Sequence, residues 1–588
     1  MNGHNDATGA LSATDPRGPL GEILSVRGSE ARVGLPAPAI SEERRATVGQ
    51  FVAVQAGVRR VIGIIAEVSA ETSEFGAYAR FKAVARVDLM GEIRADESGN
   101  LRFVRGVSGY PAIADSVVVI EREELRLIYA GTSADRISIG TLHSDESIPA
   151  YVDVQNLLAK HFAILGSTGV GKSSGVAVIL SEIMRAKPDL RVFLLDGHNE
   201  FARCFGRAAN VVNASNLKLP FWLFNFEEFV DVLYAGRSAP EEEVDILAEH
   251  IPTAKGLYLQ HRSSVERGGI GLRRVDPKTA GFTVDTPVPY LLQDLIALID
   301  ERMGKLENRA SRMNYHRLLA RIDAIRGDSR YGFMFENANV GGDTMAEILI
   351  QLFRLEPDGR PMTIMQVASL PAEVVDGVVC VLCRLAFGFG LWSDGAIPML
   401  FVCEEAHKFA SADRAVGFAP TRRALMRIAK EGRKYGVHLG LVTQRPAELD
   451  PTILSQCNTL FAMRMSNDRD QNLLRSAVTD AAANLLAFVP SLGTGEVVAI
   501  GEGLPLPARM RFSSLPPDRI PRSETFVSNV GVEPGVQDRS FVKTVVDRWR
   551  GASTPLKAAV DEGMAGEGSG STPLSGRIDM IRAQILKR

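Results

Sequence analysis

The stretch HFAILGSTGVGKS, residues 161–173, decides the fold of this chain. Residues 166–173 match the phosphate-binding pattern G-x-x-x-x-G-K-[ST] at every fixed position. An apolar, strand-like run enters the glycine loop, and the helical pattern SGVAVILSEIMRAK, residues 174–187, leaves it. A strand followed by a glycine loop and a helix predicts that backbone amides converge on a polyphosphate. The plainer alternative is a chance glycine-rich turn, which the strand and helix on either side disfavour.

The residues of this loop have distinct expected roles toward ATP and Mg²⁺, the two ligands that we predict. Lys172 is expected to neutralise the β- and γ-phosphates, and Ser173 is expected to hold Mg²⁺. The predicted nucleotide-binding residues are Gly166, Ser167, Thr168, Gly169, Val170, Gly171, Lys172, Ser173 and Ser174.

A second motif, MLFVCEEAH at residues 399–407, places two acids at the end of an apolar strand. We expect Glu404 to orient Mg²⁺ through its water shell and Glu405 to polarise the attacking water, because phosphoryl transfer needs both functions. The alternative is a pair of acids that only caps the strand. The long separation of Lys172 and Glu404 exceeds what a bare α/β core needs, so an insertion is expected between them.

The pattern of hydrophobic residues divides the chain into parts. Short Val- and Ile-rich segments over residues 20–121 predict a small closed barrel. From Tyr151, helical stretches alternate with six single apolar strands, which predicts a mostly parallel α/β sheet. We therefore expect a leader at 1–18, a β-barrel at 19–148, an α/β core of the P-loop type at 149–520 with a helical insertion at about 240–360, and a C-terminal arm, linker and terminal helix at 521–588.

Composition excludes several classes of protein. The net charge of −3 argues against a globally basic nucleic-acid-binding chain, so any DNA contact must be local. Five scattered cysteines indicate a reducing compartment, and a cytoplasmic location is expected. The most apolar stretch, Val374 to Trp392, contains Asp376 and Arg384, which favours a buried helix and no membrane contact.

Two further patterns have plainer interpretations that we prefer. Cys380 and Cys383 form a C-x-x-C without a second pair or a nearby His, which favours buried thiols over a metal site. A basic stretch with Tyr315 among its cations fits a solvated helical face slightly better than a DNA track. Its cations are Arg302, Lys305, Arg309, Arg312, Arg317, Arg321 and Arg326, while Arg422, Arg423 and Arg427 are further DNA-contact candidates on charge alone.

Together with the two motifs, later elements of the chain resemble the HerA branch of the FtsK/HerA translocases. DGHNEF at 196–201 is similar to the D-P-H-G-E-Y element of that family. KEGRKYG at 430–436, LVTQRP at 441–446 and LSQCNT at 454–459 are similar to its late motifs, in the same order. The resemblance covers roughly residues 19–530. It implies a RecA-like P-loop ATPase behind a HAS-type barrel, in a hexameric ring that moves double-stranded DNA, often beside a nuclease or another effector.

The resemblance also implies roles for two residues. Arg433 would be the arginine finger that reaches the γ-phosphate held by the neighbouring subunit, and Gln444 would be the polar sensor of that phosphate. A solvated charge at a helix end is the alternative for Arg433. His198 is as readily a structural histidine as a site residue. The catalytic set is thus Glu404, Glu405, Arg433 and Gln444, with Ser173 and Glu404 as the metal residues.

Departures from the family pattern limit this transfer of roles. Gly197 and Asn199 stand where the family has Pro and Gly, which leaves the local turn undetermined. Lys160 stands where family members often carry Arg, and Lys lacks the bidentate fork for a second contact in trans.

With the P-loop motifs, the resemblance implies a hexameric ATP hydrolase that translocates on double-stranded DNA without sequence specificity. It would work with a nuclease or another effector in DNA-end processing, as in DNA repair, or in antiviral (phage) defence. The alternative is an ATPase ring that scaffolds and activates a separate effector, such as a nuclease or a SIR2-like NADase, with DNA translocation secondary.

Overall fold

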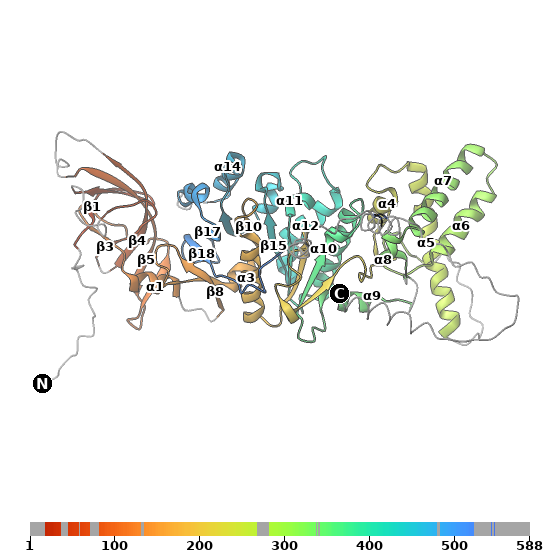
Figure 1. Cartoon of the computed structure of the whole chain (residues 1–588), viewed down its shortest axis with the longest axis horizontal. Coiled ribbons are helices and arrows are strands. Elements are labelled where there is room, and N and C mark those ends of the chain that lie inside the picture. Colours follow the sequence, from red (N-terminus) through yellow and green to blue (C-terminus); the bar gives the residue numbers. More distant parts are fainter. Residues whose placement is uncertain are drawn as a thin grey trace.

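The computed structural model describes residues 18–522 except 37–44, 58, 71–80, 131–134, 267–280, 337, 339–341 and 479–482, and also Lys543 and Val546. The predicted leader and C-terminal arm lie almost wholly outside the described residues. The described part is elongated, with a β-barrel at one end, a large sheet with helices in the middle and a group of helices at the other end (Figure 1).

The N-terminal strands close into the predicted antiparallel barrel, in the order β2-β1-β7-β3-β4-β5 with β2 also paired to β5. Closure leaves no free edge among these six strands, and β6 pairs with β5 outside the ring. Alternating Val and Ile side chains fill the interior. The strands are β1 (Gly21–Arg27), β2 (Glu30–Leu35), β3 (Phe51–Ala56), β4 (Arg59–Ala70), β5 (Ala83–Ala95), β6 (Leu101–Arg105) and β7 (Ser116–Val119).

Helix α1 (Arg122–Ala130) joins the barrel to the rest of the chain. An ion pair of 2.7 Å between Arg60 of β4 and Glu124 of α1 is largely removed from solvent. The rings of Phe51 in β3 and Tyr129 in α1 pack edge to face, with centroids 6.4 Å apart. Because these side chains belong to the main hydrophobic core, the barrel is packed against the sheet domain.

An eleven-stranded mixed sheet forms the centre, in the order β12-β13-β11-β14-β15-β10-β16-β17-β18-β8-β9. The strands from β12 to β16 are parallel, and all of them except β12 are buried along most of their length. The remaining pairs are antiparallel. The six apolar strands expected from the sequence are confirmed. They are β10 (Phe162–Leu165), β11 (Arg191–Asp196), β13 (Met362–Gln366), β14 (Met399–Cys403), β15 (Val437–Thr443) and β16 (Thr459–Met463).

Five strands of this sheet were not expected from the sequence. Two of them, β8 and β9, lie on either side of residue 148, where the sequence pattern predicted a domain boundary. Because β8 pairs with β18, the large sheet takes in chain well before that position. The five strands are β8 (Arg136–Leu142), β9 (Pro149–Asp153), β12 (Ala209–Val212), β17 (Glu496–Gly501) and β18 (Ala508–Phe512).

The predicted helical insertion lies between β12 and β13, and its middle helices form the end of the molecule opposite the barrel (Figure 1). Lys255 is buried there, and its Nζ donates to the carbonyls of Val284 and Thr286 at 2.6 and 2.7 Å, which ties residues 283–286 to α5. The insertion contains α4 (Phe226–Tyr234), α5 (Glu241–Glu266), α6 (Leu292–Gly304), α7 (Arg309–Arg326), α8 (Gly332–Phe335) and α9 (Met345–Phe353).

The apolar stretch Val374–Trp392 forms helix α10 (Val375–Trp392). Among the described helices it alone has the length and composition to cross a membrane, yet 61% of it is buried inside the protein. Cys380 and Cys383 lie on this helix, and burial raises the pKa of both thiols. The burial of the helix and of both thiols confirms the prediction of a core helix with buried cysteines. The other helices of the central domain are α2 (Val154–Ala159), α3 (Lys172–Ala186), α11 (Ala406–Phe409), α12 (Ala419–Glu431), α13 (Pro451–Leu454) and α14 (Asp468–Ser476).

Candidate nucleotide-binding and hydrolysis site

The glycine loop runs from the end of β10 to the first turn of α3, at the carboxyl edge of the parallel strands. Gly169 and Gly171 have φ values of 75° and 96°, a region that glycine enters without steric cost. A Cβ on Gly166 would lie 2.8 Å from the Cβ of Met463 on β16. These three positions therefore need glycine, and the loop leaves the N-terminus of α3 open toward a phosphate.

Lys172 is held inside the loop. Its Nζ donates to the carbonyl oxygen of Ser167 at 2.8 Å, and the side chain is buried. Burial lowers the pKa of Lys172, and the carboxylates of Glu405, Glu404 and Glu200 act in the opposite direction. The Lys172 ammonium group thus lies near three carboxylates. This arrangement is suited to ATP together with a divalent cation.

Ser173 donates its hydroxyl hydrogen to Oε2 of Glu200 at 2.8 Å, which leaves the oxygen lone pairs free for a metal. Glu200 belongs to the loop after β11, and Asp196 fixes that loop. The carboxylate of Asp196 is fully buried and accepts the backbone N–H groups of His198, Glu200 and Phe201 at 3.3, 3.1 and 3.0 Å.

The same loop explains two of the departures from the family pattern, Asn199 and Gly197. Asn199 has a φ of 57°, the left-handed region that Asn tolerates better than most residues other than Gly. Gly197 donates its N–H to Oε2 of Glu404 at 2.8 Å, which a proline could not do. The turn is therefore compatible with both substitutions, and it gains a contact to an acid of the site.

Glu404 is buried at the end of β14, and its pKa is raised to about 8, mainly by burial and secondarily by Asp196. A divalent cation would offset this cost by stabilising the ionised form. Among the described residues, no group of three His, Cys, Asp or Glu side chains is close enough to hold a metal ion alone. The Ser173 hydroxyl and the Glu404 carboxylate are oxygen ligands of the kind that Mg²⁺ takes together with waters and phosphate oxygens.

Glu405 is buried and has a φ of 52°, a strained conformation for a residue that is not glycine. Its Oε1 accepts the amide of Gln444 at 2.5 Å and lies 3.2 Å from Nε2 of His198. Its Oε2 lies 3.4 Å from Nδ1 of His407. Gln444 also accepts the hydroxyl hydrogen of Thr168 in the glycine loop, so one amide bridges the loop and the candidate base.

Arg433 lies at the opposite side of the sheet from the glycine loop, where the parallel strands begin. It is exposed in the short helical turn Gly432–Tyr435 before β15, whereas Gln444 follows the end of that strand. The seven residues of β15 span roughly 20 Å at the usual rise of a strand. Arg433 therefore does not join the glycine loop of its own chain.

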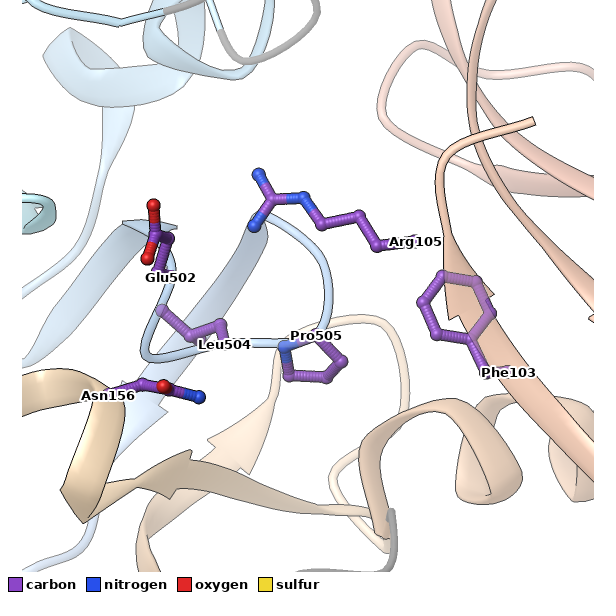
Figure 2. Close-up of a pocket in the computed structure, with 6 residues that line it drawn as sticks. All are labelled: Phe103, Arg105, Asn156, Glu502, Leu504 and Pro505. Carbon is purple, nitrogen blue, oxygen red and sulfur yellow. The ribbon is translucent and has the colours of Figure 1, made fainter. Parts of the chain in front are cut away.

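Lys160 lies at this same edge, before β10, and its Nζ is 2.8 Å from Oε1 of Glu502. A cleft of about 350 Å³ adjoins Glu502 between barrel strand β6 and the loop after β17. Figure 2 shows Arg105 reaching across it, and Arg105 donates to the carbonyl of Gly501 at 3.1 Å. Because its lining comes from the edge opposite the glycine loop, this cleft is separate from the nucleotide site. The lining residues are Phe103, Arg105, Asn156, Glu502, Leu504 and Pro505.

The basic DNA-contact candidates make contacts within the chain. Arg423 pairs with Glu227 at 2.8 Å, and Arg427 lies 4.3 Å from the ring centroid of Phe387. Arg422 donates to the carbonyl of Ser411 at 3.4 Å. In the basic stretch of α6 and α7, Lys305 pairs with Glu301 and Arg321 lies over Tyr234. These contacts give no preference for any of them as a DNA contact.

The structure adds three residues that were not in the predicted site: Glu200, His198 and His407. Each belongs to a motif that was recognised, because Glu200 and His198 stand in DGHNEF and His407 follows the paired acids. The sequence did not show which other motif each of these side chains would contact. Parallel pairing of β11 and β14 brings the ends of both strands to one edge, and this places the two motifs in contact.

Replacement of Glu200 by Gln should raise the Mg²⁺ concentration needed for half-maximal ATP hydrolysis severalfold, because the Ser173 hydroxyl would lose its charged acceptor. Titration of Mg²⁺ at saturating ATP measures the effect. Glu182→Gln on the same helix as Ser173 is the matched control, since Glu182 pairs with the exposed Arg185. An unchanged Mg²⁺ requirement would show that Glu200 does not act on the metal.

Comparison with known proteins agrees with this geometry. Residues 137–386 match the DUF87 family model described as "Helicase HerA, central domain". The chain is 27% identical over 461 residues to the DNA double-strand break repair helicase HerA of Pyrococcus furiosus, covering 73% of this chain and 77% of that protein. A probable DNA double-strand break repair helicase HerA of Methanocaldococcus jannaschii is 25% identical over 488 residues, with coverage of 76% and 92%.

Among solved structures, VirB4 of Thermoanaerobacter pseudethanolicus aligns with a TM-score of 0.44 and 13% identity, over 66% of this chain and 98% of that one. The family model, the two archaeal relatives and the P-loop geometry agree with one another. Residues 137–386 thus match the central domain of HerA helicases, and the chain is similar to HerA proteins over 73% to 76% of its length.

Proposed function

We propose that this chain is one subunit of a hexameric ring that couples ATP hydrolysis to translocation on double-stranded DNA. The observation that carries the proposal is the division of the catalytic set between two edges of one sheet. Lys172, Ser173 and the paired acids gather at one edge, and Arg433 lies at the other. A second copy that presents its Arg433 edge to this site would complete it, so hydrolysis would take place at a subunit interface.

The side chains then have the following roles. Lys172 neutralises the β- and γ-phosphates. Ser173 and Glu404 would hold Mg²⁺, which when bound would supply positive charge for the phosphate oxygens. Glu405 accepts the proton of the attacking water. Gln444, which joins Thr168 to Glu405, senses the γ-phosphate. Loss of that phosphate weakens the contact in trans and lets neighbouring subunits shift.

The DNA substrate is inferred from the relatives, which are named as double-strand break repair helicases. These names favour DNA-end processing over defence as the role of this chain. The nuclease partner that we propose for it rests on the family resemblance of the sequence motifs. Contact with DNA would be to phosphates without base reading.

Blunt duplex DNA should raise steady-state ATP hydrolysis severalfold over the rate without DNA or with single strands, because translocation couples the cycle to the duplex. The rate is measured at one stated salt concentration, with Lys172→Ala as the blank. The stimulation should fall as salt rises, because phosphate contacts release counterions. A rate that duplex DNA leaves unchanged would contradict the translocase and favour a ring controlled by an effector protein.

A further inference from the structure

We propose that His198 is a positioning residue for the candidate base, Glu405. Its imidazole holds the Glu405 carboxylate in the orientation that polarises the attacking water. The inference rests on the proposed ATP hydrolysis and assigns a role to a residue that was equally compatible with a structural one. It starts from the 3.2 Å approach of His198 Nε2 to Oε1 of Glu405.

Glu405 needs such a partner because its backbone is strained and its side chain is buried. A carboxylate in this position keeps one rotamer only when its surroundings fix it. The described groups within hydrogen-bond or ion-pair reach are His198 and Gln444 at Oε1 and His407 at Oε2.

Two of these three partners have other commitments. Gln444 also binds Thr168 in the glycine loop, and a γ-phosphate held by that loop would compete for its amide. His407 Nδ1 lies 2.9 Å from Oγ1 of Thr443 and 3.4 Å from Glu405, so its closer partner is the hydroxyl. His198 is the partner that remains at Oε1 when Gln444 turns to the phosphate.

The loop that carries His198 is suited to a fixed position. Buried Asp196 accepts three backbone N–H groups from residues 198–201, and Gly197 is tied to Glu404. The His198 side chain is itself 40% exposed, so it adds little to the core. A histidine that only filled the core would be buried, and this distinguishes the positioning role from the structural one.

The test compares three substitutions by their effect on kcat and on KM for ATP. Glutamine places its Nε2 near the position of the imidazole Nε2, so His198→Gln should keep most of the turnover. Asparagine matches only the nearer ring nitrogen, and leucine has no donor. His198→Asn and His198→Leu should therefore lower kcat by about tenfold or more with KM unchanged, because positioning acts on the chemical step.

The expected order is wild type, then Gln, then Asn and Leu together. If Asn and Gln behave alike, or if the loss appears in KM at constant kcat, the positioning role is wrong. The thermal unfolding midpoint of each variant tests for a structural effect, and a drop in Tm that follows the loss of activity would also refute the role. Failure of the proposed hydrolysis is a different result, since wild type and Lys172→Ala would then turn over ATP equally.

Discussion

Arg433→Ala should lower ATP turnover by about 10³-fold or more while nucleotide binding and assembly stay largely intact. A guanidinium supplied in trans stabilises the charge of the transition state, and such fingers contribute on the order of 10³ to 10⁵ in kcat. Arg433 is exposed at the edge of the sheet opposite its own glycine loop, so its loss should not disturb the local site. Steady-state hydrolysis and equilibrium binding of a labelled ATP analogue measure the two effects separately.

Mixing two inactive variants tests whether the contact is made between subunits. Arg433→Ala subunits retain an intact glycine loop, and Lys172→Ala subunits retain the finger. In a mixed ring some interfaces would join the good loop of one to the good finger of the other, and hydrolysis should return to a fraction of the wild-type rate. Lys434→Ala is the matched control, since Lys434 is an exposed cation in the same turn.

Two outcomes would contradict the finger. One is normal hydrolysis by monomeric Arg433→Ala subunits. The other is a mixture that stays as inactive as its components although mixed rings form. In either case the solvated-charge interpretation of Arg433 would be the better one, and the completing cation would have to be sought elsewhere.

Local patterns were sufficient for much of the fold. The six buried strands of the parallel region each appear as a continuous apolar run, because both faces of such a strand are covered. The glycine loop and the paired acids follow two of these runs directly, so their places at the carboxyl edge were predictable. The Val- and Ile-rich segments at the N-terminus likewise predicted a barrel.

The antiparallel side of the sheet could not be predicted in the same way. β18 pairs with β8 although Met510 and Leu142 are far apart in the chain, and no local pattern specifies that partner. Apolar residues of β8 are equally compatible with a barrel strand. The large sheet therefore begins with β8, before the predicted boundary near residue 148.

The candidate site shows the same limit at the level of side chains. The motif DGHNEF was recognised, but only the pairing of β11 with β14 brings Glu200 to Ser173 and His198 to Glu405. A contact between two motifs depends on the order of the strands in the sheet, and the local patterns of the sequence do not reveal that order. Arg433 is the opposite case. It belongs to a recognised motif, but the folded sheet places it far from the glycine loop of its own chain.

Glu405→Gln should lower kcat by about 10² to 10⁴, the usual contribution of a general base, while ATP still binds. Gln has the size of Glu but cannot accept the proton of the attacking water. Single-turnover hydrolysis gives the rate of the chemical step, and filter binding gives the affinity for ATP. The result to expect is a ring that holds ATP without hydrolysing it.

Glu404→Gln is the informative companion, because the two acids are adjacent yet differ in surroundings. Burial raises the pKa of Glu404 to about 8, so its neutral form is favoured far more than in an exposed glutamate before a metal binds. Gln resembles that neutral form, and the variant should fold normally and keep the contact to Gly197. Its defect should be a higher Mg²⁺ requirement that added Mg²⁺ partly corrects. If added Mg²⁺ rescues Glu405→Gln instead, the roles assigned to the two acids are reversed.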